Sequence, residues 1–135
     1  MSAGYSGTPL ARKLGIKAGA TVAVLGEPDD FRSLLVDLPD AVSFRTRLTG
    51  EPDLVVAFET ERRHLLRTLQ RVEPVIHPDR VVWIAWPKKS SGEPTDLSGD
   101  VVRAAILDTS LVDVKVCAIS EVWSGLKAVW RKDLR

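Results

Sequence analysis

The strongest constraint on the fold of this chain is an uninterrupted apolar run over residues 81–86, which reads Val-Val-Trp-Ile-Ala-Trp. Its β-branched and aromatic residues predict a strand, and the lack of polar alternation predicts that both faces of this strand are covered. Because strands covered on both faces are typical of parallel sheets, we expect a central strand of such a sheet. Pro87 has no N–H to donate and is expected to end it.

Other stretches of the chain predict further strands. Two compact apolar runs, residues 21–25 and 53–58, are predicted to be buried strands of the same sheet. Residues 42–48 alternate in polarity, as does a half-exposed strand near a sheet edge. Two more alternating stretches, residues 112–118 and 126–131, predict an antiparallel pair that closes the chain.

Four helices are predicted from apolar side chains spaced three and four residues apart. A short helix covers residues 8–15, a second covers residues 29–38, a third follows Thr60, and a fourth begins at Thr95 and Asp96. Threonine and aspartate favour these starting positions because their side-chain oxygens accept hydrogen bonds from the first N–H groups of a helix.

This order of elements predicts an α/β protein. Strands that alternate with helices favour a Rossmann-like, mostly parallel sheet with flanking helices, to which the chain adds a C-terminal antiparallel hairpin. We expect residues 1–135 to form a single domain, in which residues 1–18 are an N-terminal segment and short helix packed on the sheet.

Composition excludes several classes of function. The chain has 19 basic and 18 acidic residues and a net charge of +1, which argues against bulk binding to nucleic acid or to an anionic membrane. One cysteine, Cys117, and two histidines predict neither a disulfide nor a metal site. No apolar run approaches the ~20 residues of a membrane span, and the N-terminus does not read as a signal peptide, so a cytoplasmic protein is expected.

The terminal hairpin after βαβα units resembles the class I fold of S-adenosylmethionine-dependent methyltransferases, shortened by one helix and one strand after residues 42–48. Local motifs resemble more narrowly the DUF3052 family of small bacterial proteins. The matching segments are residues 5–17, 86–92 with Thr95 and Asp96, 112–118 and 121–126. The resemblance covers nearly the whole chain and implies no activity, because that family is functionally uncharacterised.

The methyltransferase resemblance implies a cofactor loop after the first strand, which here would be Gly26 and Glu27. That loop has a single glycine, and no carboxylate follows the second strand until Glu51. A dinucleotide site is disfavoured because Gly-x-Gly-x-x-Gly is absent and Asp29 and Asp30 add negative charge. We therefore expect no cofactor, with S-adenosylmethionine bound by a degenerate loop as the alternative.

A ligand site is predicted where the central strand ends. The candidate residues are Lys88, Lys89, Ser90, Ser91, Gly92, Thr95, Asp96, Trp123 and, as a flap, Tyr5. Lysines, hydroxyl groups and free N–H groups beside a helix N-terminus can hold a phosphate or carboxylate. Trp86 and Trp123 are candidates for an aromatic wall of the same site.

These residues leave several functions open. The preferred hypothesis is a small-molecule domain for an anionic ligand, or a protein-interaction domain, without methyl transfer. The alternatives are an active methyltransferase and a structural subunit. Against the ligand site stand a solvated turn for the 88–92 loop and a helix-start role for Asp96, both of which the sequence favours, and a packed tail for Tyr5. Four arginines, Arg62, Arg63, Arg67 and Arg71, predict a solvated basic helix face, with a binding face as the alternative.

Overall fold

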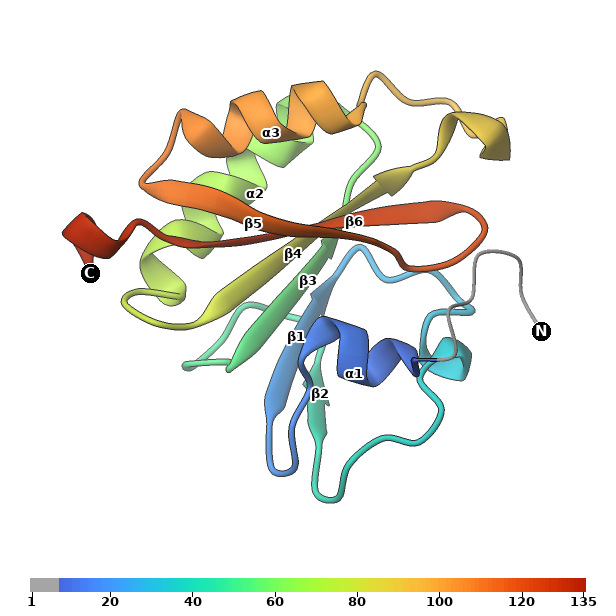
Figure 1. Cartoon of the computed structure of the whole chain (residues 1–135), viewed down its shortest axis with the longest axis vertical. Coiled ribbons are helices and arrows are strands. Elements are labelled where there is room, and N and C mark those ends of the chain that lie inside the picture. The colour runs from blue at the N-terminus through green and yellow to red at the C-terminus, as the bar shows by residue number, and fades with distance from the viewer. Residues whose placement is uncertain (1–7) are drawn as a thin grey trace.

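The fold is built on one sheet of six strands, seen in a computed structural model that describes residues 8–135 (Figure 1). The strands are β1 (Thr21–Leu25), β2 (Ser43–Arg45), β3 (Leu54–Phe58), β4 (Val81–Pro87), β5 (Leu111–Ala118) and β6 (Trp123–Trp130). The helices are α1 (Leu10–Leu14), α2 (Arg62–Val75) and α3 (Gly99–Leu107), with 3-10 turns η1 (Arg32–Leu34), η2 (Lys89–Ser91) and η3 (Lys132–Leu134).

The strand order β2-β1-β3-β4-β6-β5 makes this a mostly parallel sheet with an antiparallel end. Strands β2, β1, β3 and β4 run parallel to one another, whereas β6 is antiparallel to both β4 and β5. The predicted α/β fold with a C-terminal antiparallel hairpin is therefore confirmed. As predicted, β4 lies in the middle of the sheet.

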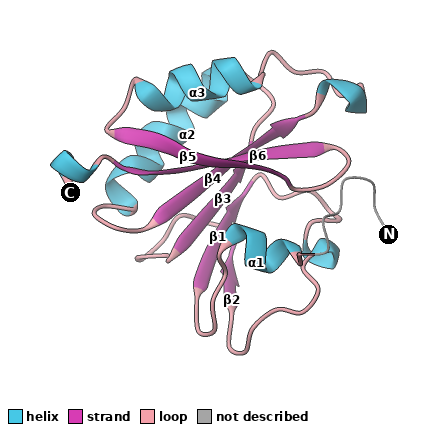
Figure 2. Cartoon of the chain, in the orientation of Figure 1, coloured by secondary structure: helices cyan, strands magenta, loops and turns pink. Residues whose placement is uncertain are grey.

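Helices α2 and α3 cover one face of the sheet, and α1 lies on the opposite face (Figures 1 and 2). The apolar stripe of α2 that was predicted from spacing packs on the sheet through Leu65, Leu69 and Val72. On the α1 side, Leu10 and Leu14 pack against buried residues of β1, β3 and β4. Each face of the central strands thus has its own core.

Trp83 is the largest side chain with no exposed surface. It points from β4 into the core on the α1 side, where its indole Nε1–H donates a hydrogen bond to the backbone oxygen of Leu14 at 3.0 Å. This bond satisfies the only polar atom of the indole and ties the end of α1 to the centre of the sheet. Gly15 then reverses the chain with a left-handed φ of 82°.

The helix predicted over residues 29–38 is wrong. Only the short turn η1 forms there, and Asp37 has a left-handed φ of 57°, which is incompatible with a continuing α-helix. Phe31 and Leu35 are nevertheless buried, so the apolar spacing reflects burial of a turn. The segment has ten residues before Pro39, which is too short for propensity alone to hold a helix.

Two helix starts also differ from the prediction. Helix α3 begins after Ser98, whose Oγ accepts the N–H of Val101 at 3.3 Å, and not at Thr95 and Asp96. Helix α2 has Glu61 at its N-cap position instead of Thr60. The N-cap lies one residue further along for α2 and two to three residues further along for α3. The residues that were expected to act as caps instead bond to each other's segments, Thr95 to the Thr60 oxygen and Asp96 to the Arg62 N–H.

Replacing Trp83 with phenylalanine should destabilise the protein by about 2 to 4 kcal/mol, because the change leaves a small cavity and removes the N–H donor from the buried Leu14 carbonyl. The free energy of unfolding in urea measures this. Trp130→Phe is the matched control, since its indole also donates to a backbone oxygen, that of Glu73, but is only partly buried. An equal loss for both variants would contradict the role given to Trp83.

Candidate functional site

A cavity of about 570 Å³ opens at the carboxyl ends of β1 and β3. Its lining residues come from the two strand ends and from α2, and they are Leu25, Gly26, Phe58, Glu59, Thr60, His64, Arg67, Thr68 and Arg71. Open α/β sheets bind their ligands at this edge. We call this cavity the carboxyl-edge pocket.

Glu59 is the partly buried acid of the carboxyl-edge pocket. The strand ladder ends beside it, where its N–H donates to the backbone oxygen of Ala85 at 2.9 Å. Its Oε2 accepts a hydrogen bond from the hydroxyl of Thr68 at 2.6 Å. Burial raises the pKa of the Glu59 carboxyl, and the Thr68 hydrogen bond and nearby His64 oppose that shift. The hydrogen bond between Thr68 and Glu59, which are nine residues apart in the chain, therefore holds the Glu59 carboxyl at the wall of the pocket.

Basic side chains line the pocket from α2. His64, Arg67 and Arg71 line it from positions three and four residues apart on α2, so their side chains lie along one face of that helix. His64 Nδ1 lies 3.3 Å from Glu61 Oε2. Among residues 8–135, neither Arg67 nor Arg71 forms an ion pair with a carboxylate.

The predicted cofactor loop, Gly26 and Glu27, is held by contacts within the protein. Gly26 has a left-handed φ of 65°, and a Cβ there would approach the Phe58 carbonyl oxygen to 2.7 Å. The glycine is therefore required by the close approach of β1 and β3, irrespective of a ligand. Glu27 Oε2 lies 2.8 Å from Arg32 Nε, and that guanidinium stacks 4.2 Å from the centre of the Phe44 ring. These contacts occupy the Glu27 carboxylate.

The predicted 88–92 loop is the turn η2, held mainly by its own hydrogen bonds. The Ser91 hydroxyl donates to the Lys88 oxygen at 2.7 Å, and Gly92 ends the turn with a left-handed φ of 74°. The Lys88 N–H donates to the Val122 oxygen at 2.7 Å, which fixes the loop to the β5–β6 connection. Lys88, Lys89, Ser90, Ser91 and Gly92 do not line the carboxyl-edge pocket, and their anion site stays a prediction.

Thr95 and Asp96 form hydrogen bonds to the chain segment that enters α2, next to the pocket. The Thr95 hydroxyl donates to the Thr60 oxygen at 2.6 Å, and Asp96 Oδ1 accepts the N–H of Arg62 at 2.7 Å. Asp96 therefore supports a helix start, as the more modest prediction had it, but the helix is α2 and not α3. A carboxylate at this end is favourable because the helix dipole is positive there.

The aromatic wall predicted from Trp86 and Trp123 does not form. Trp86 packs in the core under α2 and α3, whereas Trp123 lies on the α1 side of the sheet, edge-on to Phe58 with ring centres 5.0 Å apart. The two residues are on paired strands one register step apart, and successive side chains on a strand point to opposite faces. Tyr5 lies outside the described residues.

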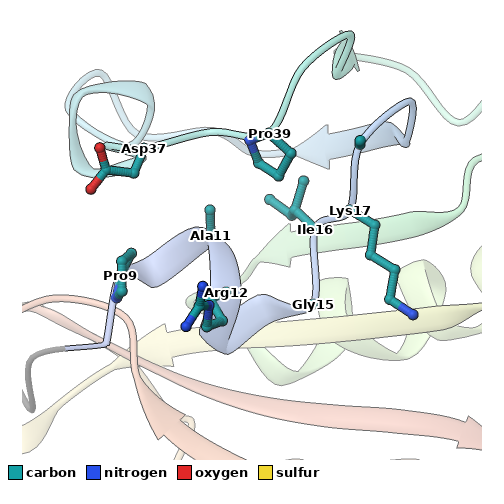
Figure 3. Close-up of a pocket in the computed structure, with 9 residues that line it drawn as sticks. Pro9, Ala11, Arg12, Gly15, Ile16, Lys17, Asp37 and Pro39 are labelled. Carbon is teal, nitrogen blue, oxygen red and sulfur yellow. The ribbon is translucent and has the colours of Figure 1, made fainter.

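A second hollow, of about 680 Å³, lies between α1 and the segment before β2 (Figure 3). Its floor is made by Ala11 and Ile16. Figure 3 shows Asp37 and Lys17 on opposite sides of it, with the Lys17 side chain directed away. Its charged groups do not converge on one point, and it lies away from the carboxyl ends of the strands, so it is the weaker candidate despite its size.

Sequence reasoning missed Glu59 and Thr68. The available signal was position, because Glu59 directly follows a run that was predicted to be a buried strand, and strand ends meet at the ligand edge. Arg67 and Arg71 were noticed, but as members of a solvated face. Among residues 8–135, no three histidine, cysteine or acidic side chains are grouped so that they could hold a metal ion. No helix in that range is long and apolar enough to cross a membrane.

No family model and no curated protein matches the chain, so the resemblance to the DUF3052 family has no support beyond its motifs. Solved structures do match. A S-adenosylmethionine-dependent methyltransferase from Aquifex aeolicus is 15% identical with a TM-score of 0.65, covering 88% of this chain and 86% of its own. A ribosomal protein L11 methylase from Lactobacillus delbrueckii is 14% identical with a TM-score of 0.55, covering 90% and 75%.

A third similar structure is the magnesium protoporphyrin IX methyltransferase of Synechocystis, solved with S-adenosylmethionine bound. It is 9% identical with a TM-score of 0.57, covering 90% of this chain and 74% of its own. At such identities the comparisons establish the fold alone. The chain has a shortened, Rossmann-like fold of the class I methyltransferase type.

Replacing Asp96 with alanine should destabilise the protein by about 1 kcal/mol, because the first N–H of α2 loses its acceptor. Thermal or urea unfolding measures the change. Asp96→Asn is the control, since its amide oxygen can still accept that hydrogen bond and it should lose less. If asparagine cost as much as alanine, the negative charge and not the hydrogen bond would be the stabilising element.

Replacing Glu59 with glutamine should raise stability near neutral pH. Because the folded-state pKa of Glu59 is raised, ionisation opposes folding, and wild-type stability should fall as pH rises from the ordinary glutamate pKa to the raised one. The uncharged amide can still accept the Thr68 hydroxyl, so the variant should lack this decline. Urea unfolding over a pH series tests this, with the exposed Glu93→Gln as control. Parallel pH curves for Glu59→Gln and wild type would refute it.

Proposed function

We propose that this chain is a small-molecule-binding domain built on a methyltransferase fold, and that its ligand occupies the carboxyl-edge pocket. The observation that carries the proposal is the meeting of a partly buried carboxyl, Glu59, with a basic wall on α2 at the sheet edge where such folds bind ligands. Burying a carboxyl costs free energy and adds nothing to the apolar core, and such carboxyls are typical of functional sites.

Two contacts count in favour of binding without methyl transfer. Gly26 is required by its close approach to Phe58 irrespective of a cofactor, and the Glu27 carboxylate is paired with Arg32. The strand β2 ends at Arg45, whose Nη1 donates to the Thr49 oxygen, and this places a guanidinium where a carboxylate would be expected to meet ribose hydroxyls. Protein interaction through the 88–92 loop stays a prediction.

A second candidate function is S-adenosylmethionine-dependent methyl transfer, which the structural neighbours favour. Three methyltransferases share the fold, one of them with this cofactor bound. When bound, the cofactor would supply an activated methyl group. For this chain, Glu59 and Thr60 are the polar residues at the strand ends that would be nearest to hold it, but no residue here is assigned a step in methyl transfer.

Backbone amide chemical shifts, recorded while the chain is titrated with small hydroxylated and anionic metabolites, test the proposal. We expect the perturbed amides to cluster at Gly26, Glu59, Thr60 and Arg67. Perturbations confined to residues 88–92, or absent from the pocket with every compound, would contradict it.

Thermal unfolding with S-adenosylmethionine and S-adenosylhomocysteine separates the two candidates. Ligand at about 100 times its dissociation constant stabilises by about 2.7 kcal/mol, which corresponds to a midpoint shift of roughly 8 to 12 °C for a chain of this size. We expect no shift with either compound. A shift of that size would replace the first candidate with the second.

A further inference from the structure

Only some of the basic residues of α2 form the basic wall of the carboxyl-edge pocket. Of the four arginines on this helix, Arg67 and Arg71 line the pocket, whereas Arg62 and Arg63 do not. Arg63 has a partner, since its Nε lies 3.2 Å from Glu61 Oε1. Arg62 lines a different hollow, between α2 and α3, so Arg67 and Arg71 are the arginines of α2 that face this cavity.

Arg67 and Arg71 are four residues apart and repel one another, as like charges at that spacing do on any helix. Four other arginines, Arg32, Arg63, Arg80 and Arg103, each lie within ion-pair distance of a carboxylate; Arg103 Nε, for example, lies 3.0 Å from Asp113 Oδ2. The acid that lines the pocket, Glu59, accepts a hydrogen bond from Thr68 and forms no ion pair with either arginine. Two guanidinium groups without a carboxylate partner therefore line the pocket, and an anionic ligand would supply one.

The chemistry of these side chains favours a phosphate over other anions. Guanidinium groups bind phosphate oxygens through two parallel N–H donors, and an imidazole beside them adds a further donor. The same pocket also offers hydroxyls at Thr60 and Thr68 and acceptor oxygens at Glu59. A ligand that carries both a phosphate group and hydroxyl groups would find partners for both, and a cavity of about 570 Å³ holds a ligand of metabolite size.

We propose that His64, Arg67 and Arg71 form the phosphate subsite of the carboxyl-edge pocket, and that the ligand of this protein is a small phosphate monoester carrying hydroxyl groups. This inference rests on the proposed function, because it names the ligand class of the same pocket. It moves the anion site from the 88–92 loop to α2.

Titration with inorganic phosphate, followed by ³¹P line broadening and by calorimetry, tests the subsite without knowledge of the whole ligand. The double variant Arg67→Gln with Arg71→Gln should weaken phosphate binding at least tenfold. Arg63→Gln, on the same helix but outside the pocket, is the matched control and should leave the affinity unchanged. The double variant should unfold at no lower temperature than the wild type, because it removes a repulsion.

Equal phosphate affinity in the wild type and the double variant would overturn the inference. So would an equal loss in the control, which would show attraction to a diffuse basic surface. The double variant also distinguishes failure of this inference from failure of the proposed function. If the pocket is a ligand site without a phosphate subsite, neutral hydroxylated compounds should still perturb the amides of Glu59 and Thr60 in the double variant.

Discussion

The complete burial of β4 is the constraint on which the rest of the structure depends. Trp83 and Trp86 are nearly inaccessible to solvent and belong to different cores, so both faces of this strand need a covering layer. Helices α2 and α3 provide one layer. The other is assembled from the short α1, the turn after β1 and Ile119, and the Trp83 indole holds it through a single hydrogen bond to Leu14. Five helical residues are sufficient there because they fill a specific position over the strand.

The same arrangement creates the pocket. Parallel pairing of β1 with β3 brings Gly26 against Phe58, and the chain after β3 then turns into α2 with Glu59 at the corner. A segment from beyond β4 supplies the bonds that hold this corner, through Thr95 and Asp96. The loop between β3 and α2 therefore carries polar residues of the pocket, and the segment after β4 holds that loop in place. The two tasks are divided between segments that are about 35 residues apart in sequence.

Strands were predictable from sequence because β1, β3 and β4 are compact apolar runs whose burial is decided by local composition. The turn after β1 was not, because Phe31, Leu34 and Leu35 have helical spacing whether they lie on a helix or merely cover a sheet. The site shows the same limit. Glu59 belongs to no local pattern, and its burial depends on Thr68 and on β1. Asp96 had the correct chemistry for a cap, but which helix it caps is decided by tertiary contacts.

The outer strand β5 ends the sheet in a way that affects how molecules of this protein meet. Its ladder with β6 is interrupted between Asp113 and Lys115, and Val114 and Val116 are 53% and 54% exposed. An unprotected edge with two exposed valines would be a template for another strand. The irregularity breaks the even spacing of free backbone groups, and Lys115 adds a charge that a second copy would have to bury. Both features oppose the pairing of β5 with a further strand, although apolar side chains are exposed along it.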